Sequence, residues 1–146
     1  MRARAGRGGR AGFTLIEILV VVVILGILAI VVVPQFANAT EDAAQTTTLS
    51  ELDKLRRAIE VYRARNGTMP LIPAGSGTWG PLVGTGEYLR SGPVNPWVGG
   101  VNRNVIIHRS SPDTAFQTTH AWIYNPETGQ IWAGGFDGQD NPFPRQ

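Results

Sequence analysis

The chain contains no cysteine, so its reactive side chains are acids, histidines, hydroxyls and the amine of Lys54. This excludes disulfides, cysteine-ligated zinc and thiol catalysis. His108 and His120 have no partner at the spacing of a metal site, and both are expected on the surface at strand ends. No serine lies in a motif typical of a nucleophile, and no loop is typical of phosphate binding. The sequence therefore predicts a protein that is not an enzyme.

A group of oxygen ligands lies near the C-terminus, in the stretch "GGFDGQDN" that begins at Gly134. Carboxylate and amide oxygens in a glycine-rich turn suit a hard cation, so Asp137 and Asp140 are candidate calcium ligands. The spacing is not that of an EF-hand loop, which ends in a glutamate. Asp-Gly and Asp-Asn are also ordinary turn sequences, so a turn without an ion is the alternative. Calcium is the one ion suggested, and no cofactor is required.

An isolated acid, Glu17, lies near the start of an apolar run that continues to Val33. Counted from Phe13, the run would be about 31 Å long as a helix, which matches the hydrocarbon core of a bilayer. A carboxylate in a membrane helix is costly unless it has a partner. Glu17 therefore requires a functional explanation that a simple membrane anchor does not provide.

Charge is distributed unevenly along the chain. Four arginines precede the first acid: Arg2, Arg4, Arg7 and Arg10. Of the 13 basic residues, nine remain after this leader, against 11 acidic residues. Basic residues before the apolar run and acids after it favour a cytoplasmic N-terminus. The rest of the chain has no general attraction for nucleic acid, so no nucleic-acid partner is expected.

Two other interpretations of the N-terminal segment are open. A secretory signal peptide would have the basic start, the apolar region and the small residues Ala37-Asn38-Ala39 as a cleavage site. A core helix of a soluble domain would also be apolar. The mature N-terminus distinguishes the first of these from a membrane segment that stays with the protein.

The stretch "GFTLIE", which begins at Gly12, resembles the processing site of type IV pilins and type II secretion pseudopilins. The resemblance implies that a membrane-embedded peptidase cuts between Gly12 and Phe13, and that the new amine of Phe13 is then methylated. Gly26 and Pro34 lie where this family has helix-weakening residues. An amine of Phe13 in one copy and Glu17 of its neighbour would neutralise each other during assembly.

The resemblance also implies function, location and partners. The expected function is that of a structural subunit of a type II secretion pseudopilus or a type IV pilus-like filament. The precursor would be inserted in the bacterial inner membrane, and the filament would lie in the periplasm or at the surface. Expected partners are further copies of the chain, the prepilin peptidase and methylase, the inner-membrane assembly platform, minor pilins and the lipid bilayer.

Two details favour a type II secretion pseudopilin over a type IV pilin. Many type IV pilins close their C-terminal loop with a disulfide, which this chain cannot form. Major pseudopilins have a calcium site built partly from an acidic C-terminal loop, which implies that role for Asp137 and Asp140. The alternative function is an exported or membrane-anchored binding or sensory domain with a simple signal peptide or anchor.

A second helical pattern follows the apolar run, with a stripe at Leu52, Leu55, Ile59 and Tyr62. Asn66-Gly67 is predicted to end this helix. Strands are predicted over 104–108, 121–124 and 130–133, the last two joined as a hairpin.

The predicted fold is α+β, a long N-terminal helix packed against a small antiparallel sheet. The predicted domain organisation has four parts: a leader over 1–12, a transmembrane or filament-core half-helix over 13–34, an amphipathic half-helix over 35–67, and a loop and sheet domain over 68–146.

Overall fold

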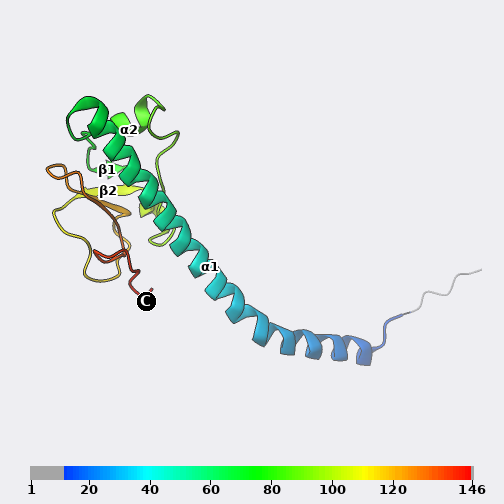
Figure 1. Cartoon of the computed structure of the whole chain (residues 1–146). Helices are drawn as coiled ribbons and strands as arrows, with labels where there is room; N and C mark the ends of the chain where they lie inside the picture. Colours follow the sequence, from blue (N-terminus) through cyan, green and yellow to red (C-terminus); the bar gives the residue numbers. More distant parts are fainter. Residues whose placement is uncertain (1–11, 146) are drawn as a thin grey trace, which may run out of the picture. The chain divides into compact units, whose positions relative to one another are not determined.

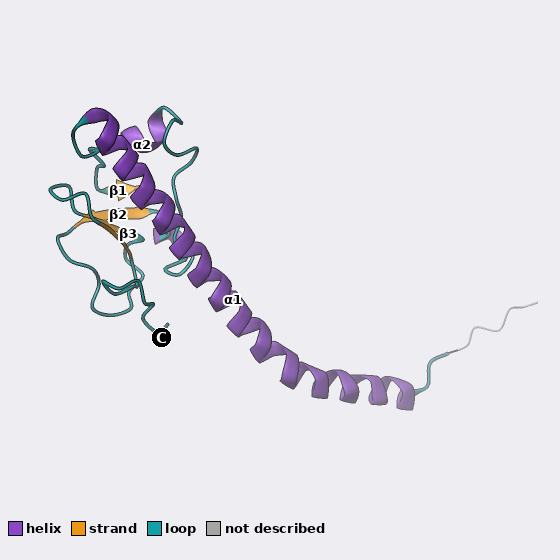
Figure 2. Ribbon diagram, viewed as in Figure 1, coloured by secondary structure: helices purple, strands orange, loops and turns teal. Residues whose placement is uncertain are grey.

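A long helix, α1, dominates the fold (Figures 1 and 2). The computed structural model describes residues 12–145. Helix α1 runs over Leu15–Asn66 and is helical at both Gly26 and Pro34. It ends where predicted: Gly67 takes a φ of 71°, and its N–H donates to the carbonyl oxygen of Arg63 at 2.8 Å. A glycine in this left-handed conformation is a common helix stop.

The chain divides into two compact units. The first unit ends at Ala39 and the second begins at Thr40. The first unit contains the apolar half of α1, and the second contains the rest of α1 with all later elements. The sequence placed the corresponding division after Pro34, within the same helix.

The second unit contains a four-stranded sheet in the order β1-β2-β3-β4. The strands are β1 (Gly75–Ser76), β2 (Val105–His108), β3 (Trp122–Tyr124) and β4 (Ile131–Ala133). A short helix, α2 (Pro81–Gly84), and a 3-10 helix, η1 (Gly100–Asn102), lie between β1 and β2. The three predicted strands are confirmed to within one residue at each end. Strand β1 was not predicted, because two residues produce no alternating pattern.

The central pair of strands corrects one prediction. Strands β1–β2 and β3–β4 pair antiparallel, but β2 and β3 pair parallel, with Ile106 opposite Trp122. The sheet is therefore mixed, and the expectation of an antiparallel sheet is wrong at this pair. The connection over 109–121 returns the chain to the end of the sheet at which β2 began, which a parallel pair requires. The α+β class itself is confirmed.

The predicted stripe of α1 packs against the sheet. Leu52 and Leu55 are fully buried and Ile59 is 4% exposed, in one apolar cluster with the fully buried Trp122 and Tyr124 of β3. Burial of large apolar side chains is the main favourable contribution to folding. This cluster joins the second half of α1 to the sheet.

Asn95 connects three parts of the second unit from a fully buried position. Its Oδ1 accepts hydrogen bonds from Thr48 Oγ1 of α1 and from the Val98 N–H, each at 3.1 Å. Its Nδ2 donates to the carbonyl oxygens of Ala121 at 2.9 Å and Gly134 at 3.0 Å. An asparagine amide can make four such bonds, and all four are present here.

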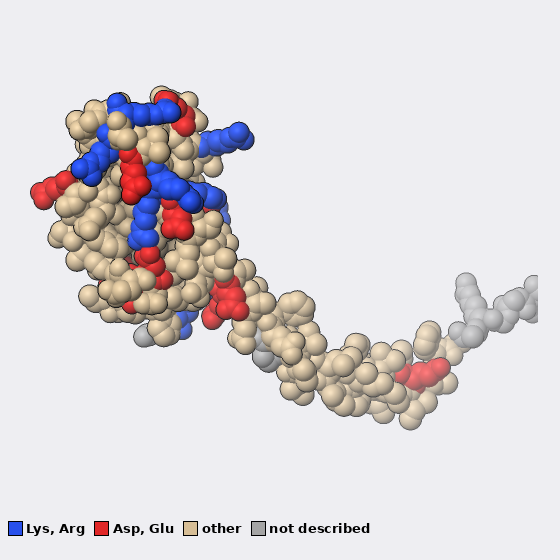
Figure 3. Space-filling view, in the orientation of Figure 1, with Lys and Arg blue, Asp and Glu red and all other residues tan. Residues whose placement is uncertain are grey.

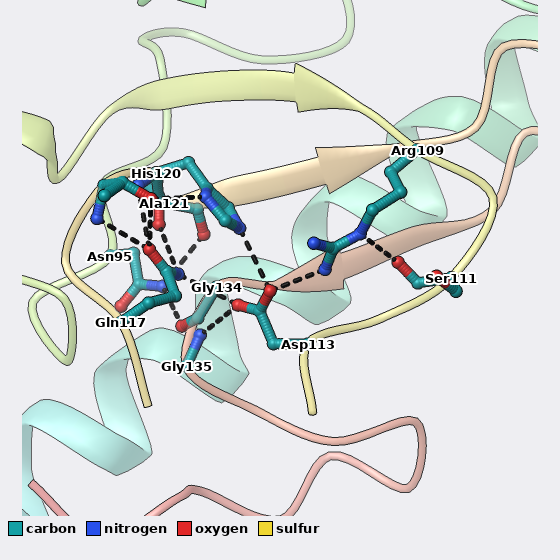
Figure 4. A network of polar contacts seen from close by, with 10 residues as sticks. Asn95, Arg109, Ser111, Asp113, Gln117, His120, Ala121, Gly134 and Gly135 are labelled. Atoms are coloured by element: carbon teal, nitrogen blue, oxygen red, sulfur yellow. Dashed lines mark hydrogen bonds and ion pairs between the residues drawn. The ribbon is translucent and has the colours of Figure 1, made fainter. Parts of the chain in front are cut away.

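A second buried network surrounds Asp113 (Figure 4). Its Oδ1 accepts from Arg109 Nη2 at 2.5 Å and lies 3.2 Å from His120 Nε2. Its Oδ2 accepts from Gln117 Nε2 and from the Gly135 N–H, both at 2.9 Å. His120, expected on the surface, is only 6% exposed, and its ring faces the buried Asp113 within the same connection. The network fastens the 109–121 connection to the end of β4.

The ionisation of Asp113 depends on this network. Burial by itself would raise the pKa of Asp113, but the hydrogen bonds from His120, from the Gly135 N–H and from Arg109 outweigh it and lower the pKa well below its usual range. The ionised carboxylate therefore contributes stability above the unfolded-state pKa of about 4, and this contribution is lost as the pH falls below that value.

We predict that Asp113→Asn lowers the free energy of unfolding at pH 7 by about 1–3 kcal/mol, because four donors lose an ionised acceptor. The variant should also lose less stability than the wild type as the pH is lowered from neutral to below about 4. Urea unfolding of the full chain in detergent, followed by tryptophan fluorescence, measures both. Asp42→Asn, at an exposed position, is the control. An unchanged acid dependence in Asp113→Asn would contradict the assignment.

Candidate assembly site at the start of helix α1

Thr14 and Glu17 form a reciprocal pair of hydrogen bonds at the N-terminus of α1. Oε2 of Glu17 accepts from the Thr14 N–H at 2.9 Å and from Thr14 Oγ1 at 3.0 Å. In return, Thr14 Oγ1 accepts from the Glu17 N–H at 3.3 Å. This is a capping box, in which Thr14 is the N-cap residue and Glu17 lies three residues later.

The capping box explains how a carboxylate is tolerated in an apolar helix. The first N–H groups of a helix have no intrahelical partner, and they give this end a partial positive charge. In lipid, water cannot satisfy those groups. Glu17 therefore has a favourable position in its own chain before any second copy is present.

Sequence reasoning missed the role of Thr14. It gave Glu17 only an intermolecular partner, the amine of Phe13 in a neighbouring copy. The signal was present, because a threonine followed three residues later by a glutamate, at the start of an apolar run, is typical of a helix N-terminus.

One oxygen of Glu17 has no hydrogen-bond partner in the described part of the chain. Within residues 12–145, Oε1 makes no hydrogen bond, whereas Oε2 makes two. Phe13 immediately precedes Thr14, and its side chain is 80% exposed. Cleavage between Gly12 and Phe13 would leave the Thr14 N–H inside a peptide bond, so the capping box would survive cleavage. The new amine would lie one residue from it.

The first half of α1 has an apolar surface on every side. Its large apolar side chains from Leu15 to Val33 are exposed over fractions between 42% at Val32 and 85% at Leu15. Figure 3 shows this part of the helix in tan, interrupted by one acidic side chain near its start. The helix is long and apolar enough to cross a membrane. An apolar surface of this extent requires lipid or protein to cover it.

Gly26 and Pro34 lie within this continuous helix. A Cβ at Gly26 would meet no other atom within 4 Å, so packing inside the chain does not require a glycine there. A proline has no N–H to donate, so α1 lacks one backbone hydrogen bond at Pro34. Their role as weak points of the helix stays a prediction.

Asp137 and Asp140 both have partners within the chain. Oδ1 of Asp137 accepts from the N–H groups of Gln139 and Asn141, each at 2.8 Å, and Oδ2 accepts from Asn141 Nδ2 at 3.0 Å. The backbone and side-chain hydrogen bonds from Asn141 lower the pKa of Asp137. Both oxygens of Asp140 accept from Arg56.

These contacts do not fit a calcium ion held between the two aspartates, because their oxygens face hydrogen-bond donors. Across residues 12–145, no three acidic or histidine side chains come together as a metal site. Calcium binding itself stays a prediction of the sequence, which only a binding measurement tests.

Comparison with known proteins locates one match. A family model described as the prokaryotic N-terminal methylation motif matches residues 7–33. The match includes Gly12, Phe13 and Glu17 and confirms the resemblance of the "GFTLIE" stretch. No curated protein and no solved structure matches the chain significantly. Of the predicted leader over 1–12, residues 1–11 lie outside the described part of the structure.

We predict that Thr14→Val increases hydrogen exchange at the Glu17 amide by roughly 2- to 30-fold, the range expected for loss of an N-cap side chain. The valine retains the shape of threonine and the backbone N–H that donates to Glu17 Oε2, but it removes the hydroxyl that accepts from the Glu17 N–H. Exchange measured by NMR on the full chain in detergent micelles tests this. Thr14→Ser keeps the hydroxyl and should exchange as the wild type does. Equal exchange in all three proteins would show that the cap contributes nothing.

Proposed function

We propose that this chain, whose N-terminal methylation motif supports a type IV pilin-like precursor, is a structural subunit of a type II secretion pseudopilus or a type IV pilus-like filament. The precursor is inserted in the inner membrane with its N-terminus in the cytoplasm. A prepilin peptidase cuts between Gly12 and Phe13, and the amine of Phe13 is methylated. The chain is thus a substrate of the processing enzyme and has no catalytic role of its own.

The observation that carries this proposal is the geometry of Glu17. Its carboxylate is held in the first turn of the exposed apolar half of α1, with Oε2 bound to Thr14 and Oε1 left as an acceptor. Cleavage creates a positive amine at Phe13. An amine and a carboxylate that leave water together relieve each other's desolvation, and a charged donor strengthens the hydrogen bond to Oε1.

Polymerisation follows from covering the apolar surface. While the chain is a monomer, lipid covers the side chains between Leu15 and Val33. In a filament, the half-helices of neighbouring copies replace the lipid and bury the same surface. Apolar packing alone does not fix how far one helix is displaced along the next, because lipid and leucine are equally apolar. The pairing of Phe13 with Glu17 of a neighbour fixes that register.

The lack of cysteine supports the secretion-type filament within this proposal, because the C-terminal loop is closed without a disulfide. The assembly platform in the inner membrane and the minor pilins are the further partners that such a filament requires.

We predict that Glu17→Gln reduces filament yield by more than about tenfold, because removal of one charge of a pair leaves the other unpaired in an apolar environment. Glutamine retains an oxygen that can accept from Thr14, so the substitution removes the negative charge while keeping the hydrogen bond of the cap. Filaments sheared from cells and quantified by immunoblot measure the yield, and cleavage at Gly12 is followed in the same samples.

Glu41→Gln, an exposed acid after the apolar run, serves as the matched control and should assemble normally. Normal filaments from Glu17→Gln would contradict the pairing of charges. Loss of cleavage in that variant would instead assign Glu17 to processing.

A further inference from the structure

The C-terminal loop is attached to helix α1 by a two-pronged ion pair. Nη1 of Arg56 donates to Oδ2 of Asp140 at 2.6 Å, and Nη2 donates to Oδ1 at 2.9 Å. Nη2 also lies 3.5 Å from the carbonyl oxygen of Ile131 in β4. The two side chains are 36% and 29% exposed, so the pair is half-buried. A guanidinium and a carboxylate in this arrangement bind more strongly and specifically than a single contact.

The backbone of Asp140 adopts a conformation that is unfavourable for most residues. Its φ is 64°, the only positive φ of a residue other than glycine in the described part of the chain. Such a conformation persists when surrounding contacts hold it in place. The contacts here are the ion pair with Arg56, the bond from the Asp140 N–H to the Asp137 carbonyl at 3.3 Å, and the bond from the Asp137 N–H to the Asn141 carbonyl at 2.9 Å.

The same loop is fastened at two further points. Phe136 is fully buried, with its ring 5.8 Å from that of Trp97. The guanidinium of Arg145 lies over the Trp97 ring, 4.9 Å from its centre. It donates to the carbonyl oxygens of Pro96 at 3.0 Å and Trp97 at 2.7 Å. Phe136 therefore holds the start of the loop, Arg56 holds its middle through Asp140, and Arg145 holds its end.

We propose that the guanidinium of Arg56 supplies from within the chain the positive charge that closes the C-terminal loop, so that the loop folds without calcium. A calcium ion takes six to eight oxygen ligands with free lone pairs. Both oxygens of Asp140 accept from one arginine, and both oxygens of Asp137 accept from N–H groups of its own turn, so hydrogen-bond donors already face these carboxylates. A nearby guanidinium also repels a second cation.

This inference concerns the folding of the second unit and does not depend on filament assembly. An arginine stays charged at every physiological pH, and Arg56 is held beside Asp140 by the fold and need not bind from solution. Closure of the loop is thereby independent of the calcium concentration outside the cytoplasm.

The test is thermal unfolding of the full chain in detergent, with millimolar calcium chloride or with excess EGTA. Tryptophan fluorescence is a suitable probe, because all four tryptophans belong to the second unit: Trp79, Trp97, Trp122 and Trp132. We expect the same Tm for the wild type in both solutions. Arg56→Met and Asp140→Asn should each lower the Tm by roughly 4–8 °C, the shift typical of one lost contact in a domain of this size.

Three further variants sharpen the test. The Tm of the double variant of Arg56→Met and Asp140→Asn should be only slightly lower than that of either single variant, because the two side chains act as one pair. Arg56→Lys retains the positive charge but cannot donate the two parallel hydrogen bonds to Asp140. Its Tm should lie between those of Arg56→Met and the wild type. Arg57→Met replaces the exposed neighbouring arginine of α1 and should leave the Tm unchanged.

A wild-type Tm that rises in calcium or falls in EGTA would overturn the proposal. So would an Arg56→Met variant as stable as the wild type, or losses in Tm that simply add in the double variant. Should Arg56→Met fail to fold, Arg56→Lys and the comparison of calcium with EGTA on the wild type still decide the question.

Discussion

A single carboxylate in an apolar helix is the constraint around which this protein is organised. Glu17 must be paired wherever the first half of α1 leaves water, and Thr14 provides the first partner from the same chain. Because this pairing uses only one oxygen, the carboxylate remains able to accept a charged group from elsewhere. The capping box thus lowers the cost of the carboxylate in apolar surroundings and leaves one oxygen to accept the charged group that the proposed assembly supplies.

The two halves of α1 form one continuous helix, but their side chains have different surroundings. The first half exposes apolar side chains on all sides, so lipid or protein must cover it. The second half buries one stripe, centred on Leu52 and Leu55, against a sheet of its own chain. Buried polar groups then fix the details: Asn95 joins helix to sheet, and Asp113 holds the crossover that makes β2 and β3 parallel. Arginines close the C-terminal loop in a chain that has no cysteine to do so.

Features set by neighbouring residues could be predicted from the sequence, and features set by distant residues could not. The stripe at Leu52–Tyr62, the stop at Gly67 and the β3–β4 hairpin follow local patterns, and the structure confirms them. The parallel pairing of Ile106 with Trp122 depends on the path of the 109–121 connection, which has no periodic signal. The burial of His120 depends on the same path. The ion pair between Arg56 and Asp140 could not be predicted, because the two residues lie far apart in sequence. The role of Thr14 could have been predicted, since its spacing from Glu17 is a recognised capping pattern.

The central claim is that cleavage creates at Phe13 the charge that Glu17 accepts. The most direct measurement is the N-terminus of the protein recovered from membranes of cells that contain a prepilin peptidase, determined by mass spectrometry of its first peptide. The account predicts a chain that begins at Phe13 with a methylated amine. A mature chain that begins at Thr40, or one that retains Met1, would contradict it, because Glu17 would then have been removed or would face no new amine.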